Sequence, residues 1–277
     1  MMTSFIAWLT LQEARRRKLL WVGFVLGIAF LAFYGVGFYA IYREVNPHLS
    51  SNSLQRREAF NFLVMTGLYA ANFLVVMVSV LISVDTISGE IASHSIQSIV
   101  TKPLRRWEVV LGKFLGFAAL IVGCVMFLVG GVVAIGWLIS RYIPANLIQG
   151  MALMVLEGWI FLAVTLLGGT RLSTLANGVL AFGLFGLAFI GGWAEEIGSL
   201  MHNETAVNVG IVSSLILPTE ALWKRAAYLM QPSVLSSLSL TPFASFSVPS
   251  PAMVVYALLY GLAALIAAIY LFERRDL

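Results

Sequence analysis

The chain has 277 residues, of which 60% are hydrophobic and 11% are charged, and its formal net charge is +4 at pH 7. Soluble globular domains carry about 25% charged residues, so this composition excludes an ordinary soluble protein. The 17 Lys and Arg residues lie mostly at the ends of apolar runs, where they anchor membrane helices, so the positive charge indicates no nucleic-acid partner.

Six apolar runs follow one another along the chain, each long enough to cross a roughly 30 Å hydrocarbon layer as a helix. The strands of a β-barrel would alternate in polarity over about ten residues, and these runs do not. We therefore predict an all-α polytopic membrane protein with a single transmembrane domain over residues 1–277. The predicted spans are Leu19–Ile41, Phe60–Val84, Phe114–Ile139, Met151–Gly169, Leu175–Trp193 and Ala252–Phe272.

The distribution of positive charge predicts that both termini lie in the cytoplasm. With that orientation the cytoplasmic side holds eleven basic residues, namely Arg15, Arg16, Arg17, Lys18, Lys102, Arg105, Arg106, Lys113, Arg171, Arg274 and Arg275. The other side holds six, namely Arg43, Arg56, Arg57, Arg141, Lys224 and Arg225. Cytoplasmic loops carry the excess of Lys and Arg in membrane proteins, which favours this orientation.

Residues 85–106 connect spans two and three and carry the most informative pattern. Ser88 can cap a short helix whose first turn carries Glu90, a carboxylate suited to the positive end of the helix dipole. Ile96 belongs to a narrow apolar stripe, and Pro103 ends the helix before Arg106 anchors the next span. This short amphipathic helix can lie on lipid headgroups or dock into a protein, and its single formal charge, on Glu90, favours the protein.

The longest connection, residues 194–251, is predicted to lie outside the membrane on the far side. Within it, Ala206–Leu217 is mostly apolar but too short to span, which indicates a re-entrant or interfacial element. Thr219 and Glu220 then begin a second short helix with Lys224 outside its apolar stripe. This pattern predicts an amphipathic helix at the membrane interface.

Inside the predicted spans, Glu157 stands out as an acidic residue. A carboxylate near the helix centre costs about 2.5–3.5 kcal/mol on insertion scales, so Glu157 is expected to face protein or water. It lies six residues into span four, about 9 Å from the outer end at 1.5 Å per residue. It either lines a translocation path or makes an interhelical hydrogen bond, and Asn72, Thr165 and Asn177 are expected to join helices.

Catalysis and nucleotide hydrolysis by this chain are not expected. No segment matches the phosphate-binding pattern G-x-x-x-x-G-K-[ST], and no connection between spans is long enough for a nucleotide-hydrolysing domain. His48, His94 and His202 are far apart in sequence, and Cys124 lies inside an apolar run, so we predict no metal site. Any ATP chemistry therefore requires a second chain.

The connection between spans two and three resembles the permease subunits of ABC-2-type ATP-binding-cassette transporters. In that family an Asp, a Glu, a short apolar helix, a Pro, an Arg and a Gly-Lys pair precede the third of six helices. The matching residues here are Asp85, Glu90, Ile96–Val100, Lys102-Pro103, Arg106 and Leu111-Gly112-Lys113. The family more often has a Gly-Thr step where this chain has Ser93-His94-Ser95.

Two further stretches resemble the same family. Phe272–Leu277 is similar to its C-terminal F-x-R-R-D motif, and Leu217–Trp223 is similar to its stretch before the last helix. The six helices and the long outer segment also resemble the permease subgroup that works in nitrous oxide reductase maturation.

The resemblance implies a half-transporter in a plasma membrane or bacterial inner membrane, paired with a second permease chain and with ATP-binding-cassette ATPase subunits. ATP and Mg²⁺ would bind to the ATPase, and this chain would bind no cofactor. The coupling residues would be Asp85, Glu90, Ile96, Lys102, Pro103 and Arg106. Thr170–Thr174 would make a second contact with the ATPase, and Thr3–Lys18 would form an interfacial helix.

Two alternatives remain open at the level of sequence. In the first alternative, the chain is a membrane anchor that passes the work of an ATPase to an extracytoplasmic partner. In the second, it is an intramembrane enzyme. Glu157 and the segment 194–251 are the features on which these alternatives depend.

Overall fold

The computed structural model describes residues 2–16, 18–45, 53–89, 105–231 and 247–275. These residues form helices and, within the described ranges, no strand, which confirms the all-α prediction. The helices are α1 (Met2–Arg16), α2 (Lys18–Val45), α3 (Ser53–Ser83), α6 (Arg106–Ser140), α7 (Leu147–Gly169), α8 (Thr174–Leu200), α9 (Glu204–Ile216), α10 (Thr219–Met230) and α12 (Pro251–Glu273).

Six helices in the described ranges are long and apolar enough to cross a membrane, namely α2, α3, α6, α7, α8 and α12. They coincide with the six predicted spans, although several extend further than the apolar runs. Thus α6 begins at Arg106 rather than Phe114, and α8 continues to Leu200 rather than Trp193. Helical hydrogen bonding continues through polar turns at the membrane edge, whereas the predicted limits followed hydrophobicity alone.

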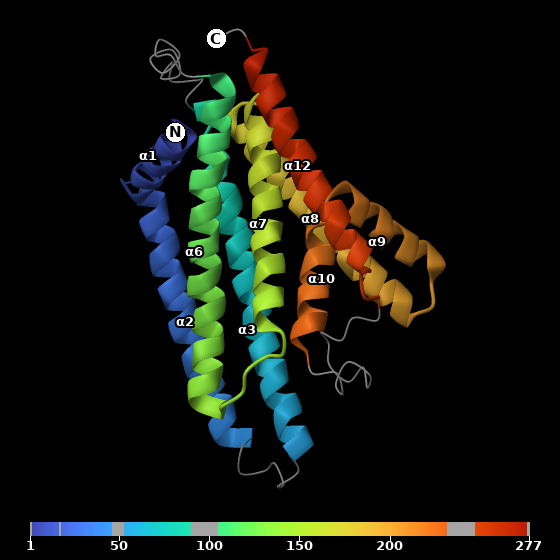
Figure 1. The fold of residues 1–277 in the computed structure, drawn as a ribbon. Coiled ribbons are helices and arrows are strands. Elements are labelled where there is room, and N and C mark those ends of the chain that lie inside the picture. The colour runs from blue at the N-terminus through green and yellow to red at the C-terminus, as the bar shows by residue number, and fades with distance from the viewer. Residues whose placement is uncertain (1, 17, 46–52, 90–104, 232–246, 276–277) are drawn as a thin grey trace.

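The long helices stand side by side in one bundle (Figure 1). Helix α1, the start of α6, the turn from α7 to α8 and the end of α12 lie at one end, which we call the terminal end. The connection from α6 to α7 lies at the opposite end. Helix α7 is central, since 67% of its most apolar window is buried, against 11% for α2 at the periphery.

Helix α1 packs across the first turns of α6. A Cβ atom on Gly112 would lie 2.6 Å from Cβ of Ile6, and one on Gly116 would lie 2.8 Å from the carbonyl oxygen of Ala7. Glycine therefore permits the contact, as expected for a G-x-x-x-G face. Thr10 is buried in this contact, while the Phe5 and Trp8 side chains on the other face are more than half exposed.

Helices α9 and α10 are joined by a bend of 105° at Leu217-Pro218, the geometry of a broken span or re-entrant loop. With 13 residues α9 is too short to span, as predicted, and it lies along α8. The interfacial location predicted for the second short helix stays a prediction, but its amphipathic pattern does not hold at Lys224, which is buried. Helix α10 packs on α7, and most of its residues are buried, including Lys224 on its predicted polar side.

Candidate functional site

Only the two edges of the predicted coupling segment fall within the described residues. Asp85 lies in the turn that follows α3, and Arg106 is the first residue of α6. Glu90, Ile96, Lys102 and Pro103 lie outside the described residues, so their predicted roles stay predictions. The described contacts of this segment are therefore those of its two edges.

The edge that follows α3 is held by the start of α8. The Thr174 hydroxyl donates to the Asp85 carboxylate at 3.2 Å and lies 2.8 Å from the Ser88 hydroxyl. The Asn177 side-chain amide donates to the carbonyl oxygen of Val84 at 3.1 Å. The short turn from α7 to α8, predicted as a second contact region, therefore lies directly beside the start of the coupling segment.

The edge that begins α6 is held by the last turn of α12. One guanidinium nitrogen of Arg106, Nη1, donates to the carbonyl oxygens of Arg275 at 2.7 Å and Glu273 at 3.2 Å. The Arg275 side chain in turn donates to the carbonyl oxygen of Thr170, which caps the C-terminal end of α7. Sequence reasoning named Arg106 and the C-terminal motif separately and gave no sign that they meet.

A further contact joins α6 directly to the turn after α3. The ammonium group of Lys113, a buried residue of α6, donates to the carbonyl oxygen of Thr86 at 3.3 Å. Lys113 belongs to the Gly-Lys pair of the family-like motif, so this structure assigns the lysine to the turn after α3. The two edges of residues 85–106 are thus connected through α6, α8 and α12 at the terminal end.

Glu157 is 2% exposed and accepts a hydrogen bond from the Asn72 side-chain amide at 3.0 Å. The expectation that it faces protein is confirmed, whereas its role in a path stays a prediction. Its predicted depth is wrong. Helix α7 begins at Leu147, so Glu157 lies ten residues into a 23-residue helix, about 15 Å along it at 1.5 Å per residue.

The polar side chains expected to join helices do so. Besides the contact between Asn72 on α3 and Glu157 on α7, the hydroxyls of Ser83 and Thr165 lie 2.6 Å apart across the same pair of helices. The Asn177 amide on α8 donates to the carbonyl oxygen of Thr165 at 2.9 Å. These contacts connect the buried middle of the bundle to the terminal end.

The family to which this architecture belongs is decided by the whole-chain comparison. A sequence model of the family described as ABC-2 family transporter protein matches residues 4–277. The chain belongs to the ABC-2 transporter family. Among curated proteins, no sequence matches it significantly. Together with six apolar helices, the family makes the chain a multi-pass protein of the inner membrane and a transport subunit.

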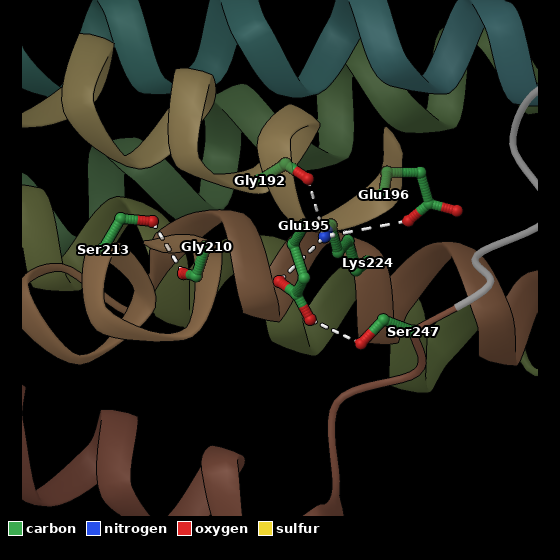
Figure 2. A network of polar contacts seen from close by, with 7 residues as sticks. All are labelled: Gly192, Glu195, Glu196, Gly210, Ser213, Lys224 and Ser247. Atoms are coloured by element: carbon green, nitrogen blue, oxygen red, sulfur yellow. Dashed lines mark hydrogen bonds and ion pairs between the residues drawn. The ribbon is translucent and has the colours of Figure 1, made fainter. Parts of the chain in front are cut away.

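Where α8 and α10 meet, this ABC-2 protein has a buried ionic network that the sequence did not suggest (Figure 2). The ammonium group of Lys224 on α10 donates to the carbonyl oxygen of Gly192 at 2.9 Å and to the carboxylate of Glu195 at 3.0 Å. A carboxylate oxygen of Glu196 lies 3.7 Å from the same ammonium group. The Ser247 hydroxyl donates to the other oxygen of Glu195.

This network joins α8, α10 and the segment before α12. Lys224 and Glu195 are 6% and 7% exposed, so both charges are largely removed from solvent. Their separation of 29 residues, 224 minus 195, leaves no local pattern by which the sequence could reveal the pair. Burial is possible here because each charge has a charged partner and further hydrogen bonds.

The hydrogen bond between Glu157 and Asn72 gives a test of the interhelical role. Glu157→Gln keeps a group that can bond to Asn72, so we expect its thermal unfolding in detergent to match that of the unmodified protein. Glu157→Leu leaves the buried Asn72 amide without its acceptor, which should cost about 1–3 kcal/mol. A leucine variant as stable as the glutamine variant would show that the bond contributes nothing to stability.

Proposed function

We propose that this ABC-2 protein is the transmembrane permease subunit of an ATP-driven transporter, energised by a separate ATP-binding-cassette ATPase chain. The match to the family over residues 4–277 carries the proposal. The terminal end supports it, because the edges of residues 85–106 are joined by hydrogen bonds to α8 and α12. A force applied to that segment therefore reaches several spans.

The terminal end is the cytoplasmic face in this proposal. The eleven-to-six distribution of basic residues supports that orientation, and an ATPase that uses cellular ATP has to dock there. The functional complex contains two permease chains and their ATPase subunits, which hold the ATP and Mg²⁺. Glu157, buried midway along α7, is the candidate for a residue of the translocation path.

The coupling role of residues 85–106 is tested by Glu90→Lys. Reversing the charge in the first turn of the predicted helix costs only about 0.3–1 kcal/mol locally, so the variant should still insert and dimerise. We expect the ATPase to co-purify with it at much lower yield, because the only formal charge of the predicted docking helix changes from negative to positive.

The matched control is Glu204→Lys. Glu204 is an exposed acidic residue in the first turn of α9, away from the terminal end, so it undergoes the same chemical change. This control should retain the ATPase at the yield of the unmodified chain. If Glu90→Lys retains the ATPase equally well, the segment is not the coupling element.

A further inference from the structure

We propose that Arg106 and Arg275 are positioning residues that join the sixth span, α12, to the coupling segment. We call these two arginines, with the carbonyl oxygens of Thr170, Glu273 and Arg275, the arginine clasp. The inference rests on the proposed function, because it assigns α12 a part in transmitting ATPase motion. It assigns Arg106 an inward contact within this chain rather than a contact with the ATPase.

The side chain of each arginine in the clasp contacts the C-terminal end of a helix other than its own. Arg106, the first residue of α6, donates to two carbonyl oxygens at the end of α12. Arg275, just beyond α12, donates to the carbonyl oxygen of Thr170 at the end of α7. The clasp therefore links α6 to α12 through Arg106, and α12 to α7 through Arg275.

The chemistry suits a firm joint. The last carbonyl groups of a helix, such as that of Glu273 in α12, have no partner within the helix and carry the negative end of its dipole. The other two acceptors, the carbonyls of Thr170 and Arg275, lie one and two residues beyond the ends of their helices. A guanidinium group is always charged and presents several N–H donors in a rigid plane, so it can satisfy such carbonyls strongly. Because the acceptors are main-chain atoms, the joint depends on the two arginines and on no other side chain.

The clasp completes a series of contacts between the two described edges of the coupling segment. From the turn after α3, Asp85 is bonded to Thr174 at the start of α8. The turn from α7 to α8 is bonded through Thr170 to Arg275, and the end of α12 is bonded to Arg106. In the amino-acid sequence, residues 90–104 connect these two edges. Displacement of one edge is therefore passed to α12 and α7.

Spin labels can test the joint in the complete chain. Leu175, at the start of α8, and Glu273, at the end of α12, are both exposed, so cysteines there can be labelled in a Cys124→Ala background. In nanodiscs, the distribution of distances between the two labels should show one narrow peak when the clasp is unmodified. Arg106→Ala combined with Arg275→Ala should broaden that peak, because the hydrogen bonds that join the end of α12 to α6 and α7 are then lost and only apolar packing remains there.

Two comparisons separate the clasp from a general loss of structure. Arg274→Ala removes an arginine from the same helix end whose guanidinium lies over its own Tyr270 ring, so the narrow peak should persist. Arg106→Lys with Arg275→Lys retains cations that can donate to the carbonyls and should restore the peak. A narrow, unmodified peak in the double alanine variant would overturn the clasp.

The same label measurement with the ATPase bound separates the test of the clasp from the test of the proposed function. With the ATPase bound, the double alanine variant should still co-purify but lose the coupling between ATP hydrolysis and movement of the label at position 273. If this movement on addition of Mg²⁺ and ATP equals that of the unmodified chain, the clasp does not transmit motion. Absence of any bound ATPase with the unmodified chain would instead contradict the proposed function and leave the label result in the isolated chain intact.

Discussion

Lys224→Met should destabilise the protein by about 3–5 kcal/mol, because it leaves the buried Glu195 carboxylate without its cation. Glu196 lies close to the same position, so the substitution leaves two neighbouring carboxylates without the ammonium group. Since α8 and α10 are held together by this lysine, we expect loss of the folded protein at moderate temperature. The measurement is thermal unfolding of the purified protein in detergent.

The double variant Lys224→Met with Glu195→Gln should recover much of the lost stability. It removes both charges of the pair, and replacing a buried ion pair by uncharged groups is often neutral. Arg225→Met is the control on the same helix, because that half-buried arginine donates to the carbonyl oxygen of Pro249 and retains contact with solvent. Equal stability of Lys224→Met and Arg225→Met would show that the buried network is not a principal support of the contact between α8 and α10.

Replacing both glycines of the α1 contact, Gly112→Ala with Gly116→Ala, should displace α1 from α6. The new Cβ atoms would lie 2.6 Å from Cβ of Ile6 and 2.8 Å from the carbonyl oxygen of Ala7, distances that ordinary packing does not allow. Overpacking of this kind costs about 1–3 kcal/mol at each site. Hydrogen exchange of the amides of Met2–Arg16 should increase, and the unfolding temperature should fall.

The matched control is Gly123→Ala with Gly130→Ala on the same helix. Among the described residues, a Cβ atom at either position meets no atom of another helix within 4 Å, so alanine adds helix propensity without a clash. This control should leave the exchange of α1 unchanged and should keep or slightly raise the unfolding temperature. Faster exchange of α1 in the control as well would mean that the effect arises from changes within α6 rather than from the close contact.

The helical architecture could be predicted because it follows from composition and apolar length alone. A run such as Ala252–Phe272 cannot leave its backbone unpaired in lipid, so a spanning helix is the physical outcome, and α12 matches it to within a residue at each end. The ends of the helices were harder to predict from the sequence. Arg106 begins α6 because the helix continues through a charged turn, and hydrophobicity carries no signal there.

Whether a polar contact could be predicted from the sequence depended on the kind of partner that the side chain has. Asn72 and Glu157 could be assigned to contacts between helices, because exposing either side chain to lipid is unfavourable. That they pair with each other could not be predicted. Lys224 was misassigned, because a lysine beside an apolar stripe is typical of an interfacial helix and its partner Glu195 comes from another element. The contacts of Arg106 and Arg275 were missed because their acceptors are main-chain carbonyls, which every residue has.

The central claim is that this ABC-2 protein works as the permease of an ATP-driven transporter. The most direct measurement is to purify the tagged full-length chain from its own membranes and determine the composition of the complex by native mass spectrometry. We predict two permease chains with two ATP-binding-cassette ATPase subunits, and ATP hydrolysis by the purified complex. A complex that contains this chain without an ATP-binding-cassette ATPase would contradict the account.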